Sequence, residues 1–186
     1  MEDIIQEHTV ENIKGKENLE FIFFWGNRRS SKITKTCFSQ WYDRGFEIDG
    51  IHYKCAEQYM MAKKAKVFAD EEIFELILKT DDPKEIKALG RKVRGYDPEV
   101  WDKHKFRIVF EGNYAKFTQN EDLKDFLLST GDKVLVEASP YDKIWGIGMR
   151  ESAEGINNPN NWKGTNLLGF AIMQVRDMLM QDINGK

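Results

Sequence analysis

The spacing of hydrophobic and polar residues varies along the chain, and a few short segments have the pattern of β-strands. The aromatic run Phe21–Trp25 is short and continuous, which is typical of a buried strand. Residues 46–53 read FEIDGIHY, two alternating runs around Asp49-Gly50, and predict a β-hairpin. Residues 134–138, VLVEA, predict one more strand.

Helical patterns fill most of the remaining chain. They are predicted over 56–68, 70–79, a segment opened by Asp82-Pro83, 98–118, 121–129 and Asn166–Gln181. Asp82-Pro83 and Asp97-Pro98 each join an N-cap residue to a proline at the first helical position. The order of the elements predicts a compact, mostly helical single α+β domain over 19–182. Residues 1–18 are expected to form a flexible or weakly ordered tail, with a short amphipathic helix within Asp3–Ile13 as an alternative.

Composition narrows the class of protein. The 186 residues are 41% hydrophobic and 32% charged with a net charge of −3, so any contact with nucleic acid has to be local. Cys37 and Cys55 have no metal-type spacing, and three histidines add little, so we expect no metal and a reducing compartment. No apolar run approaches the ~20 residues that span a bilayer. We therefore expect a cytoplasmic protein without membrane contact, metal or cofactor.

Three polar segments combine a tryptophan with hydrogen-bonding groups: CFSQWY (37–42), ASPYDKIWGIG (138–148) and NWKGTNLLG (161–169). Aromatic rings of this kind stack on bases, and loop glycines let backbone amides approach a phosphate or ribose. The alternative is that the three tryptophans only cover the edge of the core.

The helix that follows Cys55 carries a charged pair. Residues 55–65 read CAEQYMMAKKA, and Glu57 and Lys64 are seven residues apart, which places them on one helical face with Met60. A lysine on such a stripe is costly to desolvate unless it is paired or its pKa falls. The pair is therefore either a structural salt bridge or an amine nucleophile with a carboxylate that moves protons.

A basic loop, NRRSSKITK (27–35), precedes the first of these polar segments. Its cations Arg28, Arg29 and Lys32 are candidates for contact with nucleic-acid phosphates. The alternative is an ordinary solvated loop.

Taken together, these segments resemble the NADAR (NAD- and ADP-ribose-associated) or YbiA-like superfamily from about Phe21 to Met180. The matching motifs are FFWG (23–26), FSQWY (38–42), F..DG..Y.CAEQYMMAKKA..F.D (46–70), LGRKV (89–93), W.....RIV....AKF.QN..L...LL.TG (101–131), LVEASP.D.IWGIG (135–148) and G.N.LG..IM.VR (164–176). One motif alone is weak, but their order along the chain makes the resemblance specific.

This resemblance implies an N-glycosidase that cleaves the bond between ribose C1′ and a nitrogen. One branch of the family removes ADP-ribose from guanine, which reverses the modification made by a toxin. Another hydrolyses phosphorylated ribosylamino-pyrimidines of riboflavin synthesis. By resemblance, Lys64 attacks C1′ to give a Schiff base and Glu57 exchanges protons. A mechanism in which carboxylates activate water stays open.

The resemblance also implies a set of residues that bind the substrate. They are Phe24, Trp25, Gly26, Ser39, Gln40, Trp41, Asp142, Trp145, Gly146, Ile147, Gly148, Trp162, Gly164 and Asn166. Many members of the riboflavin branch have Trp-Gly-Asp-Gly where this chain has Trp145-Gly146-Ile147-Gly148, and Asp142 is the alternative acid of that loop. This departure favours the guanine reading.

The expected partner is thus an ADP-ribosylated nucleotide, DNA or RNA, with an ADP-ribosyltransferase toxin encoded alongside. A ribosylamino-pyrimidine phosphate is the alternative substrate. A module that only binds ADP-ribose or another NAD derivative is the alternative of another class, but a reader has no need for both Glu57 and Lys64.

Overall fold

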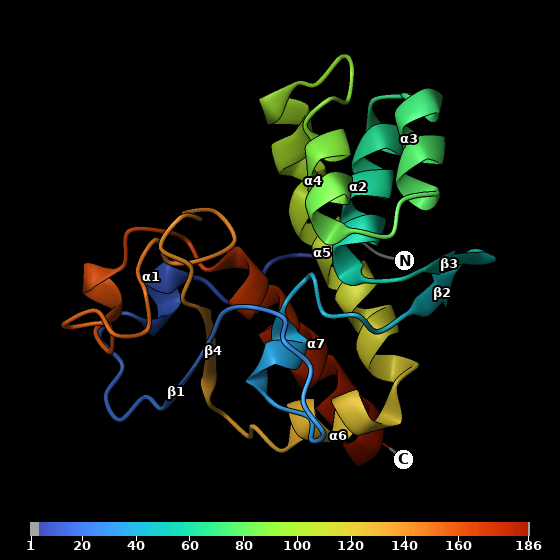
Figure 1. The fold of residues 1–186 in the computed structure, drawn as a ribbon. Helices are drawn as coiled ribbons and strands as arrows, with labels where there is room; N and C mark the ends of the chain where they lie inside the picture. Colours follow the sequence, from blue (N-terminus) through green and yellow to red (C-terminus); the bar gives the residue numbers. More distant parts are fainter. Residues whose placement is uncertain (1–3, 186) are drawn as a thin grey trace. The chain divides into compact units, whose positions relative to one another are not determined.

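The computed structural model describes residues 4–185, which are mostly helical with short strands, and this confirms the predicted fold class (Figure 1). The chain forms two compact units. The first comprises Met1–Ser39 with Glu121–Lys186, and the second comprises Gln40–Asn120. The second unit is thus inserted in the sequence between the two parts of the first.

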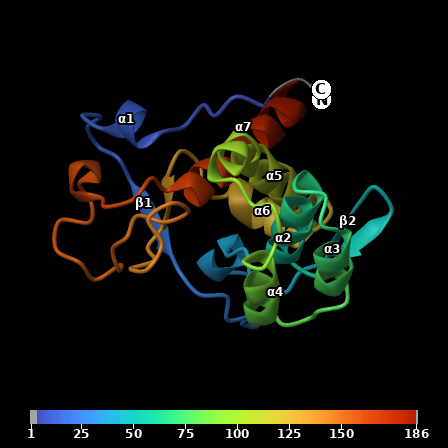
Figure 2. The same cartoon turned by 90° about the horizontal axis from the view of Figure 1, so that it is seen from above.

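In the second unit, helix α2 (Ala56–Val67) is packed against three other helices. These are α3 (Glu71–Leu78), α4 (Pro83–Gly90) and α5 (Pro98–Thr118), and Figures 1 and 2 show α3 and α4 beside α2. Residues 56–62 and 65 are buried. Because α2 is surrounded in this way, Glu57, the charged residue of its first turn, is removed from water.

Two glycines allow the neighbouring helices to approach α2 closely. A Cβ atom on Gly112 of α5 would lie 2.7 Å from Cδ1 of Tyr59. A Cβ atom on Gly90, the last residue of α4, would overlap the sulfur of Met61. Larger residues at these positions would push α4 and α5 away from the helix that carries Glu57.

The predicted helix starts are confirmed in the second unit. Asp82 and Asp97 each accept a hydrogen bond from a backbone N–H of the first turn, at 2.9 Å and 2.8 Å. Pro83 and Pro98 follow as the first helical residues. The missing N–H of proline has no consequence there, since the first turn has no intrahelical acceptors.

The predicted hairpin is also present, as β2 (Phe46–Ile48) and β3 (Ile51–Tyr53) paired antiparallel. Asp49 and Gly50 both have positive φ angles, +54° and +76°. This backbone is that of a two-residue turn whose twist matches the strands, which is why Asp-Gly is favoured there.

The first unit is built around two strands that are far apart in sequence. β1 (Phe21–Phe24) pairs in parallel with β4 (Val134–Glu137), with Phe21 opposite Val134. Helix α7 (Leu167–Asn184) contacts β4, and α6 (Glu121–Leu128) contacts α7. The short helical segments of this unit are α1 (Val10–Ile13), η1 (Lys35–Phe38) and η2 (Pro159–Asn161).

The N-terminal segment makes hydrogen bonds with α7. The Gln174 side chain accepts from the Glu7 N–H at 3.1 Å and donates to the Ile5 carbonyl at 2.8 Å, and His8 lies 2.6 Å from Asp177. The only helix described before residue 14 is the single turn α1, and residue 3 of the predicted Asp3–Ile13 helix lies outside the described range. The domain boundary near residue 18 stays a prediction.

Candidate functional site

Glu57 lies in the first turn of α2 and is only 2% exposed. Its backbone N–H donates to the Gln40 carbonyl at 2.9 Å, which ties the start of α2 to the segment that begins the second unit. The positive end of the helix dipole favours an anionic carboxylate at this position. A buried carboxyl group at a helix N-terminus is suited to hold or deliver a proton.

Lys64 lies two turns further along α2 and is half-buried. Its Nζ donates to the carbonyl of Gly90 at 2.9 Å and lies 4.2 Å from the ring centroid of Tyr96. Burial, and to a smaller extent the charge of Arg91, lower the pKa of the Lys64 ammonium below its ordinary value. Within residues 4–185, Lys64 takes part in no ion pair. Its surroundings therefore favour the neutral amine more than those of an ordinary lysine.

The structural salt bridge between Glu57 and Lys64 is thus absent from the described residues. The rise of an α-helix separates residues i and i+7 by roughly 10 Å along the axis, although both lie on one face. The adjacent lysine, Lys63, contacts other residues: its Nζ lies 3.9 Å from Asp49 and 5.5 Å from the Tyr59 ring centroid. To act on the same bond, the Glu57 and Lys64 side chains have to span this axial separation with their own length.

Helix α5 adds two buried polar residues that the sequence did not single out. Asn113 donates to the Gln40 side-chain oxygen at 2.8 Å, and Lys116, one turn further, is 0% exposed. Burial raises the pKa of the Cys55 thiol, on which the charges of Glu57 and Lys116 act in opposite directions. The sequence could have indicated these two residues through their helical spacing, because Asn113 and Lys116 share the face of α5 that carries Val109.

In the first unit, the glycine-rich loop after β4 and the start of α7 form one framework of backbone hydrogen bonds. The Ile147 N–H donates to the Glu137 carbonyl at 3.0 Å, and the Asn166 N–H donates to the Gly146 carbonyl at 3.2 Å. A Cβ atom on Gly164 would overlap the Gly146 carbonyl. The predicted glycines are therefore required for close packing of these two segments.

Several predicted binding residues in this framework have side chains engaged within the protein. Asp142 Oδ1 accepts from the N–H groups of Ile144 and Trp145 at 2.9 Å and 2.8 Å. Asn166 binds the backbone of β4 with both its amide oxygen and its amide nitrogen. Ile147 is fully buried in the core. These residues shape the loop, in which the ring of Trp145 is half-buried and that of Tyr141 is exposed.

The aromatic residues predicted to stack on a substrate are in different environments. Trp25 is 55% exposed, and its ring centroid lies 6.2 Å from that of the exposed Tyr141. Phe24 is buried. The Trp162 ring forms a T-shaped pair with Phe21, and its indole N–H donates to the Ile156 carbonyl. Of these, Trp25 with Tyr141 offers the open stacking surface.

The remaining predicted residues lie near the boundary in sequence between the units. Gly26 follows Trp25 with a φ of +81°, and Ser39 ends η1. Trp41, in the second unit, is half-buried with the ammonium of Lys87 5.9 Å from its ring centroid. The side chains of the proposed nucleic-acid contacts are exposed; they are Arg28, Arg29 and Lys32.

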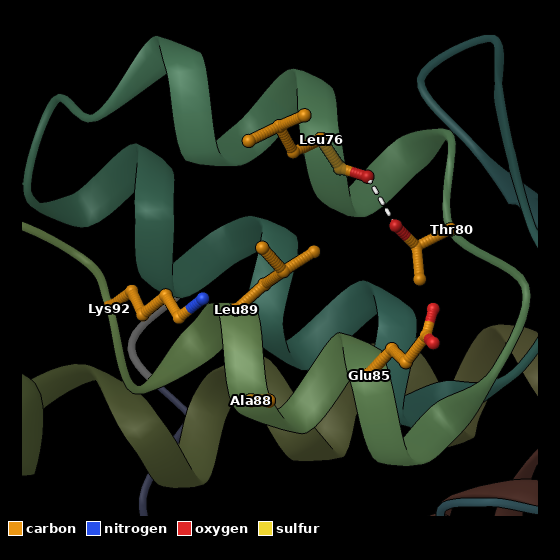
Figure 3. A pocket seen from close by; sticks show the side chains of 6 residues that line it. All are labelled: Leu76, Thr80, Glu85, Ala88, Leu89 and Lys92. Carbon is orange, nitrogen blue, oxygen red and sulfur yellow. Dashed lines mark hydrogen bonds between the residues drawn. The ribbon is translucent and has the colours of Figure 1, made fainter.

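A surface hollow of about 320 Å³ lies between α3 and α4 (Figure 3). Its lining residues are Leu76, Thr80, Glu85, Ala88, Leu89 and Lys92. The Thr80 hydroxyl donates to the Leu76 carbonyl at 2.7 Å, as the dashed line in Figure 3 marks. None of the predicted site residues lines this hollow.

Among residues 4–185, no group of three or more histidine, cysteine, aspartate or glutamate side chains is arranged to hold a metal ion. No helix in the same part of the chain has the length and apolar character needed to cross a membrane. Neither cysteine is in a disulfide, and both are buried.

The comparisons with known proteins show the family to which this chain belongs. Residues 23–180 match the model of the NADAR domain, and the chain therefore belongs to the NADAR family. This match includes α2 with Glu57 and Lys64, the loop after β4 and most of α7.

Two relatives are named N-glycosidases, and one solved structure has a similar fold. The N-glycosidase R617 of Acanthamoeba polyphaga mimivirus is 46% identical over 167 residues, which cover 87% of this chain and 97% of that protein. The N-glycosidase Npun_R5314 of Nostoc punctiforme is 34% identical, covering 76% and 83%. The NMR structure of Escherichia coli YbiA matches with a TM-score of 0.67 at 23% identity, covering 94% and 96% of the two chains.

Proposed function

We propose that this chain is an N-glycosidase that hydrolyses the bond between ribose C1′ and guanine nitrogen in ADP-ribosylated nucleic acid or nucleotide. The observation that carries the proposal is the half-buried amine of Lys64, whose pKa is lowered by burial, on the same face of α2 as the buried Glu57. A module that only recognises ADP-ribose needs no amine of lowered pKa beside a buried carboxyl group.

In the proposed reaction, the neutral Lys64 amine attacks C1′ while the C1′–N bond breaks. Glu57 delivers a proton to the departing guanine nitrogen, and the resulting carboxylate takes one proton from the attached amine nitrogen. That proton passes to the ring oxygen O4′ as the C1′–O4′ bond breaks, which gives a protonated Schiff base. Water then adds to C1′ and returns a proton to Glu57, and the C1′–Nζ bond breaks to release ADP-ribose and the free amine. For this sequence the Lys64 amine has to exchange the Gly90 carbonyl for the substrate.

Hydrolysis of a ribosylamino-pyrimidine phosphate is the alternative within the same enzyme class, and it is the less favoured one here. The names of the relatives do not separate the two substrates, but the loop after β4 does supply an argument. Ile147 stands where many members of that branch have an acid, and its side chain is apolar and fully buried. Asp142, the other acid of the loop, holds two backbone N–H groups.

The test compares both substrates in one assay. Wild-type protein is incubated with guanine-ADP-ribosylated oligonucleotide and, separately, with the ribosylamino-pyrimidine phosphate, and the released base is measured by chromatography. We expect turnover of the oligonucleotide and its loss in Glu57→Gln. The matched control is Glu75→Gln on α3, an exposed glutamate paired with Lys79 at 3.7 Å. Turnover of the pyrimidine substrate alone would assign the alternative, and turnover of neither would refute the glycosidase proposal.

Contact with a nucleic-acid strand rests on the basic loop with Arg28, Arg29 and Lys32. If this loop binds phosphates, affinity for the modified oligonucleotide falls steeply with added salt, whereas affinity for a modified mononucleotide changes little. Equal salt dependence for both would make the free nucleotide the better substrate class.

A further inference from the structure

The second unit contains a buried amide pair next to Glu57 that the reaction above does not use. Asn113 Nδ2 donates to the Gln40 side-chain oxygen and to the Val109 carbonyl, both at 2.8 Å. The Gln40 backbone carbonyl accepts the N–H of Glu57 at 2.9 Å. The pair is therefore attached to the first turn of α2, where the proposed proton donor lies.

These contacts determine the orientation of both amides. If the Asn113 amide were flipped, its oxygen would face two acceptors, the Val109 carbonyl and the Gln40 oxygen. If Gln40 were flipped, its nitrogen would face the Asn113 nitrogen, which is also a donor. The donor–acceptor assignment therefore follows from the contacts themselves.

One donor and one acceptor of this pair take no part in their mutual hydrogen bond. Within residues 4–185, Gln40 Nε2 and Asn113 Oδ1 have no hydrogen-bond partner in the protein, although Gln40 is 8% exposed and Asn113 is 0% exposed. Buried amide groups without partners are rare because their desolvation is uncompensated. A group that accepts from Gln40 and donates to Asn113 matches both atoms, and a hydroxyl oxygen has this property.

We infer that Gln40 and Asn113 together hold one hydroxyl oxygen, that of a ribose hydroxyl or of the water that completes hydrolysis, beside Glu57. This inference rests on the proposed function, since it deepens the description of the same site. Gln40 Nε2 donates to the oxygen, and Asn113 Oδ1 accepts its proton. Asn113 also orients Gln40, so it acts as a positioning residue as well as a contact.

The experiment uses binding as well as turnover. ADP-ribose and its analogues lacking one ribose hydroxyl are titrated by calorimetry into wild type, Asn113→Leu and Gln40→Met. The control is Gln58→Leu: this buried amide donates to the carbonyls of Ile77 and Thr80 at 3.0 Å and accepts from the Lys54 N–H at 2.8 Å. It has no unused donor or acceptor, so its removal is expected to lower stability and leave ADP-ribose affinity unchanged.

Both arms of the inference give a defined outcome. If the oxygen belongs to ribose, Asn113→Leu and Gln40→Met lose roughly tenfold or more in ADP-ribose affinity, and one deoxy analogue binds equally to wild type and variants. If it belongs to water, affinity is unchanged, while kcat falls at constant KM. Unchanged affinity and unchanged kcat in folded Gln40→Met would overturn the inference and leave the proposed function standing. Wild type without binding or turnover would refute both.

Discussion

The most informative perturbation of this protein is the removal of the Lys64 ammonium. Lys64→Met keeps an unbranched side chain on α2 and deletes the amine that donates to Gly90 and lies over Tyr96. The proposal requires this amine to form the bond to C1′, so the change should abolish turnover and leave the fold in place.

The structure sets the expected size of the loss in stability and of the loss in kcat. A hydrogen bond from a charged group contributes about 1.5–3 kcal/mol and an exposed cation–π contact about 0.5–1 kcal/mol, and the relief of desolvation offsets part of this loss. We therefore expect Lys64→Met to lower the free energy of unfolding by about 1–3 kcal/mol, which a typical domain tolerates. Loss of a nucleophile should lower kcat at least about a thousandfold, which corresponds to ~4 kcal/mol in the transition state.

The assay combines three measurements. Urea unfolding gives the change in stability, single-turnover kinetics give the chemical step, and borohydride reduction during turnover gives a mass adduct whose position is mapped by peptide analysis. The matched control is Lys63→Met, which removes the adjacent ammonium near Asp49. In wild type, kcat/KM should rise with pH through the pKa of Lys64, because only the neutral amine attacks, and this pKa lies below the ordinary 10.5.

Two results would refute this reasoning. If Lys64→Met retains more than about a tenth of the wild-type kcat, the amine is not the nucleophile and the water-activated mechanism applies. An adduct on Lys63 would instead assign the nucleophile to that lysine, and the absence of any adduct while turnover proceeds would favour the water-activated mechanism.

Three further predictions concern packing, acid stability and stacking. Gly112→Ala places a Cβ atom 2.7 Å from Tyr59, so urea unfolding should show about 1–3 kcal/mol lower stability; an unchanged midpoint would show that α5 can shift. Hydrogen bonds from Arg94 lower the pKa of Asp70, so the ionised Asp70 stabilises the fold fully above pH ~4, and this stabilisation is lost as the pH falls through the folded pKa. Asp70→Asn should therefore make the free energy of unfolding depend less on pH in the acid range. An unchanged pH dependence of unfolding would contradict this prediction. Trp25→Ala should weaken binding of the ADP-ribosylated guanine nucleotide by about 1–3 kcal/mol in calorimetry at unchanged thermal stability, and equal affinity would exclude stacking.

Local patterns in the sequence were enough to predict most elements and the charged helix. Asp-Pro starts and the Asp49-Gly50 turn act through neighbouring residues, so their outcome is nearly independent of the rest of the fold. The seven-residue spacing of Glu57 and Lys64 likewise follows from helical geometry alone. The parallel pairing of β1 with β4 was not predicted, because it joins segments more than a hundred residues apart and no local signal encodes it.

The tertiary structure decided what the charged residues do. Sequence periodicity placed Glu57 and Lys64 on one face, but the packing of α3, α4 and α5 around α2 removed Glu57 from water and directed the Lys64 amine to Gly90. The same packing brought Asn113 to Gln40, seventy-three residues earlier in the chain. Burial and long-range contact set the pKa and orientation of a polar group, and both depend on which helices meet. The sequence alone therefore determined the spacing of the two charged residues along α2, and only the fold determined their surroundings.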